Sequence, residues 1–175
     1  MQNPQRQQVM DGTVLHAMRL LGAMAVLAVG AIHLQQYIGA DYRTIPTIGP
    51  LFLLNAVASA IVGAGLILPL GRLLSARKAH AAIGLLALGA VLIAVGALAA
   101  LFISESGGLF GFTEHGYRAA IVVAIVAEGS TVLLLGPVAA IKLVQASSTD
   151  AKRPTHGREA TPLATARARR AALPE

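Results

Sequence analysis

The sequence predicts an all-α protein whose four membrane-spanning helices pack as one bundle. Four long apolar stretches, separated by short polar joints, fill most of the 175 residues. The chain is 55% hydrophobic and 13% charged, with a mean hydropathy of +0.68, whereas a soluble domain carries about a quarter charged residues. Because backbone groups in lipid must be hydrogen-bonded within the protein, each apolar stretch is expected to be a helix.

The apolar stretches set the domain organisation. The four spans are expected at residues 20–38, 48–68, 81–103 and 119–141. Each has about the 20 residues that a helix needs to cross ~30 Å of hydrocarbon. Together they form a transmembrane domain over residues 14–143, between a disordered start (1–13) and a disordered basic tail (144–175). Their many Gly and Ala residues favour close packing of helices in a membrane.

The basic residues predict the orientation. If the N-terminus is cytoplasmic, twelve of the 14 Lys and Arg residues lie on that side, and only Arg43 and Arg118 lie outside. Such an excess is typical of cytoplasmic loops. We therefore expect a multi-pass protein of the plasma membrane with both termini in the cytoplasm. The net charge of +6 then follows mostly from this topology.

Basic residues at the cytoplasmic surface suggest lipid partners. In the inner loop and the tail, we expect the following residues to meet anionic lipid headgroups: Arg72, Arg77, Lys78, Arg167, Arg169 and Arg170. A partner-binding or nucleic-acid arm is the alternative for the tail. Since no nucleic-acid-binding fold is indicated, we expect no nucleic-acid partner.

Several classes of function are disfavoured by what the sequence lacks. There is no cysteine, so disulfides, thiolate metal sites and thiol nucleophiles are excluded. The sequence also contains no phosphate-binding Gly loop, no GxSxG, no HExxH and no dinucleotide fingerprint. It therefore favours a non-enzymatic protein.

One acidic residue, Glu128, lies inside the last apolar stretch, RAAIVVAIVAEGSTVLLLGPVAAIK. A charged side chain in hydrocarbon costs about 2.5–3.5 kcal/mol on insertion scales, so an intramembrane acid needs other helices around it. Ala124 and Ala120 lie one and two turns before it. Because small residues let a second helix approach closely, we predict that Glu128 points into the bundle.

His33 in the first span and Asn55 in the second are the predicted neighbours of Glu128. In the expected orientation both lie in the outer half of the membrane, with Glu128 near the middle. More polar residues are expected around the outer mouth of this cluster: Tyr37, Glu105, Glu114, His115 and Tyr117. Residues that faced lipid would have no reason to gather on one side of the membrane.

Three interpretations of this polar cluster stay open. The first is an interhelical hydrogen-bond network in a non-enzymatic or accessory subunit, at about 0.6–2 kcal/mol per bond. The second is a small-solute or proton-coupled carrier with Glu128 as its proton site. The third is a redox subunit that holds haem or a quinone through His33. A homo-oligomer or a membrane protein partner is compatible with each.

No cofactor is expected from the spacing of the candidate ligands. A bis-His haem needs two His at mid-membrane, and neither His33 with His115 nor His16 with His80 is placed there. A divalent metal held by imidazole and carboxylate groups is the alternative, with His33, His115, Glu114 and Glu128 as its ligands.

Part of the sequence resembles a family of small four-span integral membrane proteins frequent in actinobacteria. The resemblance rests on AIHLQQYIGADYRTIPTIGPLFLLNAV, followed by GGLFGFTEHGYR and AEGS, and it covers residues 19–143. It implies the four-span topology and no particular reaction. The positions that belong to the shared pattern are His33, Tyr42, Pro46, Asn55, Glu114 and Glu128.

Overall fold

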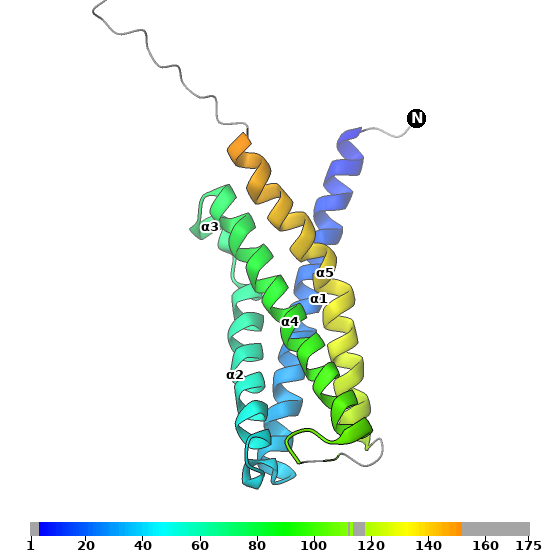
Figure 1. The fold of residues 1–175 in the computed structure, drawn as a ribbon. Coiled ribbons are helices and arrows are strands. Elements are labelled where there is room, and N and C mark those ends of the chain that lie inside the picture. Colours follow the sequence, from blue (N-terminus) through cyan, green and yellow to red (C-terminus); the bar gives the residue numbers. More distant parts are fainter. Residues whose placement is uncertain (1–3, 112, 114–117, 152–175) are drawn as a thin grey trace, which may run out of the picture.

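Four long helices form one antiparallel bundle (Figure 1). The computed structural model describes residues 4–111, 113 and 118–151. The elements are α1 (Pro4–Gly39), the 3-10 turn η1 (Tyr42–Thr44), α2 (Ile48–Ile67), the one-turn helix α3 (Leu70–Leu73), α4 (Ala76–Gly107) and α5 (Ala119–Ala151). The start of α1, α3 and the end of α5 lie at one end of the bundle, which we call the terminal end; η1 lies at the other, the loop end.

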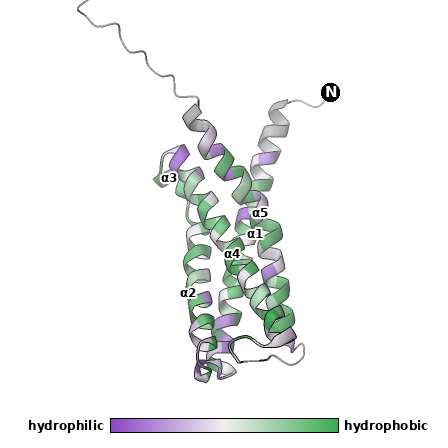
Figure 2. Cartoon of the chain, in the orientation of Figure 1, coloured by the Kyte–Doolittle hydropathy of each residue, from purple (hydrophilic) through white to green (hydrophobic). Residues whose placement is uncertain are grey.

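The helices α1, α2, α4 and α5 are long and apolar enough to cross a membrane, as the sequence predicts. Apolar residues cover the middle of the bundle, and hydrophilic residues gather toward its ends (Figure 2). Among the large apolar side chains, Ile61 is 65% exposed and Leu133 is 76% exposed. An apolar surface of this extent is unfavourable in water, so it fits a bilayer as the surrounding solvent.

The first helix begins earlier than the sequence analysis expects. Residues 1–13 are predicted to be disordered, but α1 starts at Pro4. Proline is tolerated at the first helical position because it needs no amide donor there, and glutamine, which is frequent in this segment, is a good helix former. The polar start is therefore an extension of the first span along its own axis.

The last helix likewise continues into the predicted tail. Residues 144–175 are predicted to be disordered, but α5 runs to Ala151. The hydroxyls of Ser147 and Ser148 donate hydrogen bonds to backbone carbonyls one turn earlier, so these polar residues are accommodated within the helix. The prediction of disorder for residues 152–175 lies outside the described residues.

Small residues set the distances between the helices. A Cβ on Gly30 of α1 would lie 2.9 Å from the Cβ of Ser59 on α2. A Cβ on Gly84 of α4 would lie 2.8 Å from the Leu143 side chain on α5. Because both distances are shorter than van der Waals contact, the helices meet at a spacing that only glycine permits at these positions.

The apolar core lies in the half of the bundle nearer the terminal end. Its fully or largely buried members come from all four long helices: Ala23, Val26, Leu66, Ile83, Ala87, Ala90, Leu135, Val138 and Ala139. Four of these nine are alanine, which agrees with closely packed helices. The other half of the bundle, toward the loop end, is packed differently and contains His33, Asn55 and Glu128.

Candidate ligand-binding site

The loop half of the bundle is not filled by side chains. Nearer the terminal end α2 and α4 are in contact, since a Cβ on Gly65 would lie 3.0 Å from Leu86. Farther along α4, a Cβ on Gly96 would have no neighbouring atom of the described residues within 4 Å. A cavity of about 480 Å³ occupies the space that opens there, and all four long helices line it.

The cavity is mostly apolar and reaches the outer surface of the bundle. Small residues on α4, namely Gly96, Ala97 and Ala100, leave room on that side. Leu54 of α2 and Leu92 of α4 also line the cavity, yet they are 64% and 62% exposed. The cavity therefore opens between α2 and α4, on the apolar face that suits lipid, so its opening leads toward the bilayer.

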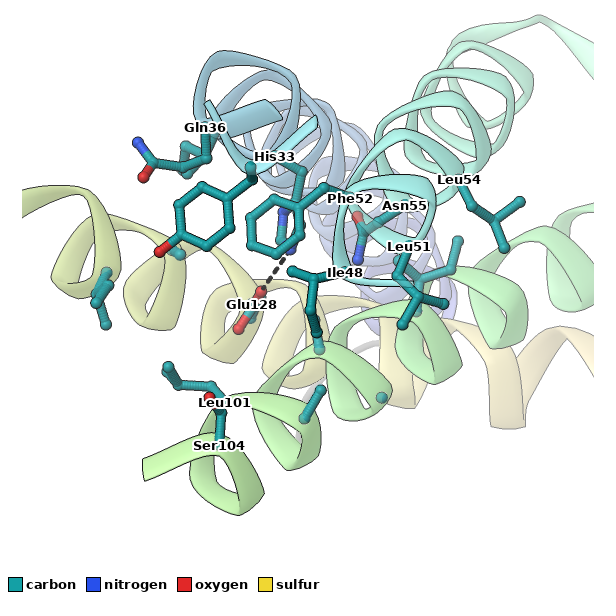
Figure 3. A pocket seen from close by; sticks show the side chains of 18 of the residues that line it. His33, Gln36, Ile48, Leu51, Phe52, Leu54, Asn55, Leu101, Ser104 and Glu128 are labelled. Atoms are coloured by element: carbon teal, nitrogen blue, oxygen red, sulfur yellow. Dashed lines mark ion pairs between the residues drawn. The ribbon is translucent and has the colours of Figure 1, made fainter. Parts of the chain in front are cut away.

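Two ionisable side chains in the wall of this cavity point toward each other (Figure 3). Glu128 of α5 is only 2% exposed. Its Oε1 lies 3.9 Å from Nε2 of His33 on α1. This separation is longer than a direct hydrogen bond, so a small movement or one bridging polar atom would join the two groups.

The backbone of α1 determines which nitrogen of His33 carries hydrogen. Nδ1 lies 2.9 Å from the carbonyl oxygen of Val29. A carbonyl only accepts, so Nδ1 donates and Nε2 is left to face Glu128. A neutral imidazole then accepts a proton from a carboxylic acid, whereas an imidazolium donates to a carboxylate. In either state one proton is held between them and the pair is neutral overall, which limits the cost of burying it.

An aromatic series connects His33 to the loop end. Phe52 lies with its ring centroid 5.0 Å from that of His33, and Tyr42 stacks on Phe52 at 4.7 Å with 16° between the ring planes. Arg118, just before α5, donates a hydrogen bond to the Tyr42 hydroxyl. A Cβ on Gly49 would lie 2.7 Å from the Tyr42 carbonyl oxygen, so α2 begins directly against η1 and holds this series in place.

Asn55 lines the cavity on the α2 side. Its Oδ1 accepts a hydrogen bond of 3.1 Å from the hydroxyl of Ser59, which is fully buried. Since the amide oxygen is used in this way, the amide nitrogen is the group that Asn55 can offer to a ligand. The cavity thus brings together His33, Asn55 and Glu128.

The other predicted residues of the outer mouth have different outcomes. Tyr37 on α1 and Glu105 on α4 are half-buried near the loop end, but neither lines the cavity. Three predicted mouth residues lie outside the described residues: Glu114, His115 and Tyr117. The same holds for the basic tail residues Arg167, Arg169 and Arg170, whereas Arg72, Arg77 and Lys78 are exposed at the terminal end.

The structure adds lining residues that the list of predicted site residues omits, and two of them have a signal in the sequence. Gln36 lines the cavity and follows His33 by three positions, which places both on one face of a helix. Ser104 is 5% exposed and lines the cavity one residue beyond the predicted third span. With Gly96 and Ala100 it forms a run of small residues four apart, the spacing of one helix face.

A metal centre is not indicated by the described part of the chain. Within residues 4–111, 113 and 118–151, no group of three or more His, Cys, Asp or Glu residues could hold a metal ion. Two of the four candidate metal ligands, Glu114 and His115, lie outside these residues.

The fold and the cavity define a class of protein: an all-helical bundle with four candidate membrane spans and a lateral cavity. No protein-family model, no curated protein and no solved structure matches the chain. The resemblance to an actinobacterial family therefore stays a prediction. Because a fold alone does not imply a function, the function has to be argued from the cavity.

Proposed function

We propose that this chain is a non-enzymatic, multi-pass protein of the plasma membrane that binds a small lipophilic molecule in the cavity between α2 and α4. Both termini lie in the cytoplasm, so the cavity occupies the outer half of the membrane. The ligand enters sideways from the bilayer, and its polar head lies against His33, Asn55 and Glu128. The chain acts as a binding subunit, alone, as a homo-oligomer or with a membrane protein partner.

The size of the cavity carries this proposal. The cavity has a volume of about 480 Å³ and is open on one side. Atoms that line an empty space lose their van der Waals partners, so the space is expected to be occupied. About 300–1,000 Å³ is the usual size range of small-molecule sites.

The lining indicates the chemistry of the occupant. The walls are largely apolar and open toward lipid, which favours an apolar body over a water-soluble one. The polar groups are few and lie together, as in sites where they orient the head of a ligand. When the His33–Glu128 pair shares one proton it is neutral overall, so an uncharged head that forms hydrogen bonds, such as a phenol, an alcohol or a quinone, suits it best.

A role in packing alone accounts for less of the geometry. A network that existed to join helices would bring its members into hydrogen-bond contact, whereas His33 and Glu128 lie 3.9 Å apart beside open space. The hydrogen bond between Asn55 and Ser59 lies within α2 and joins no two helices. His33, Glu128 and Asn55 thus lie around the cavity, and no hydrogen bond described between these three residues joins two helices.

A proton-coupled carrier is the second candidate, and one observation favours it. The bond from Nδ1 to Val29 directs Nε2 of His33 at the carboxyl group of Glu128, so the pair can pass one proton to or from a bound molecule. In reconstituted vesicles, Glu128→Gln would abolish coupled proton movement while leaving the fold intact. If the wild-type protein moves no protons with any solute, binding remains and the carrier role is refuted.

The binding role is tested by filling the cavity. Both Gly96 and Gly136 have open space where a Cβ would be, but only Gly96 lines the cavity. We expect the wild-type protein and the control Gly136→Trp to retain the same small molecule when extracted with native lipid and studied by native mass spectrometry. Gly96→Trp should lose it. If all three proteins carry the same molecules in the same amounts, the cavity is not a ligand site.

A further inference from the structure

A second crevice lies at the terminal end of the bundle, separate from the cavity. It lies between α1, which contributes His16 and Arg19, and the segment from the end of α2 into α3, which contributes Ile67, Pro69 and Arg72. Along the bundle axis, the crevice lies at the level where α2 ends and the chain passes through α3 to α4. Figure 2 shows hydrophilic residues at this end, on α3 and on the adjoining part of α1.

Arg19 is buried at this crevice with an unused donor. Arg19 is only 9% exposed, and its Nε has no hydrogen-bond partner among the described residues. Native proteins rarely leave a buried donor unpaired, and each such group needs an explanation. The penalty is greatest for charged groups, so a small movement of the Arg19 side chain that lets a ligand accept from Nε would remove a substantial cost.

Further cations adjoin Arg19, and little negative charge opposes them. Lys142 of α5 is close enough for its charge to act on that of Arg19, and it also acts on His80 of α4. The buried Nδ1 of His80 has no hydrogen-bond partner among the described residues. Among the described side chains at this end, the carboxylate is that of Asp11. Asp11 is exposed and lies eight residues before Arg19, which is ~12 Å along the helix.

We propose that this crevice binds the phosphate group of an anionic phospholipid from the cytoplasmic leaflet. The guanidinium of Arg19 presents Nε and a terminal nitrogen side by side, a geometry that matches two oxygens of one phosphate. Arg72 approaches the remaining oxygens from the other side of the crevice, and His16, when it donates, approaches them from the same side as Arg19. Basic pockets between membrane helices at the cytoplasmic side have this ligand chemistry.

The surroundings of the crevice favour a lipid over free phosphate. Leu68 is 49% exposed and Leu73 is 66% exposed, next to crevice residues Ile67 and Arg72 in the chain. Exposed apolar side chains beside a basic crevice suit acyl chains attached to the phosphate. A free anion would gain nothing from them.

The test titrates the full-length protein in detergent with short-chain phosphatidylglycerol, phosphatidylcholine and inorganic phosphate, and counts bound molecules by native mass spectrometry. We expect Arg19→Gln to weaken phosphatidylglycerol binding at least ~10-fold, since a charge-assisted bond to a buried donor is lost. Arg72→Gln, which changes an exposed side chain and preserves the fold, should weaken it ~5-fold. Lys78→Gln removes the same charge outside the crevice and should change binding by less than ~2-fold.

Three results would overturn the proposal. Equal effects of Arg72→Gln and Lys78→Gln would mean that only the general surface charge attracts lipid. Equal binding of phosphatidylglycerol and phosphatidylcholine would mean that the crevice does not select an anion. If inorganic phosphate displaces phosphatidylglycerol and its own binding requires Arg19 and Arg72, the phosphate chemistry is right but the lipid source is wrong.

Discussion

Gly30 provides the sharpest test of the seam that positions the cavity. A Cβ at Gly30 would lie 2.9 Å from the Cβ of Ser59 and 3.1 Å from the carbonyl oxygen of Ala56. Both atoms belong to the rigid part of α2, so no side-chain rotation relieves the contact. Ordinary van der Waals contact begins near 3.4 Å. In Gly30→Ala the two helices must therefore move apart by about half an ångström.

The expected change in stability follows from two opposing contributions. Overpacking of a well-packed site costs about 1–3 kcal/mol, while replacing Gly by Ala inside a helix gains at most ~1 kcal/mol. Gly136→Ala is the matched control, because its Cβ meets no described atom within 4 Å and only the gain applies. Gly30→Ala should thus be less stable than Gly136→Ala by about 1–3 kcal/mol.

The assay is reversible unfolding in mixed micelles with an increasing fraction of sodium dodecyl sulfate, followed by helical circular dichroism. The same displacement should also weaken ligand binding, because His33 follows Gly30 by three residues on one helix face and would move with it relative to Asn55. If Gly30→Ala is as stable as Gly136→Ala, α1 and α2 are not in contact at this seam. The placement of His33 opposite the α2 side of the cavity would then be unfounded.

Two further predictions concern the cavity wall. Asn55→Ala leaves the buried hydroxyl of Ser59 without its acceptor, so unfolding in the same assay should show a loss of about 1–3 kcal/mol. Adding Ser59→Ala should restore part of that loss, and strictly additive effects would show that the bond contributes nothing. Because the chain has no Trp, Leu92→Trp and Leu133→Trp each introduce a single fluorophore at exposed positions. We expect brominated lipid to quench both equally, and protection at Leu92 alone would mean that another protein surface covers the opening.

Much of the fold follows from one-dimensional features of the chain. Hydropathy locates the spans because a helix needs a set length to cross hydrocarbon, and the predicted starts of the second and fourth spans, 48 and 119, are those of α2 and α5. The start of α1 and the end of α5 lie beyond the predicted bounds. Polar residues there leave the membrane but still form helix, so hydropathy reports where the bilayer ends and not where the helix ends.

The candidate site was only partly accessible from the sequence. Glu128 and His33 stand out because ionisable groups are rare inside spans. Phe52 does not stand out, since a phenylalanine in a span is ordinary in composition. Its importance comes from what lies opposite it: the Phe52 ring stacks on that of Tyr42 from η1 and lies tilted by 43° to that of His33 from α1.

The sequence by itself determined the number of spans, their helical form and the polar residues that must avoid lipid, because these depend on the transfer of each segment from water to hydrocarbon. Only the tertiary structure decided that α2 and α4 touch at Gly65 and separate at Gly96, which creates the cavity. Such a separation depends on the mutual fit of side chains on different helices, since packing is a property of facing surfaces. No segment of the chain carries that information alone.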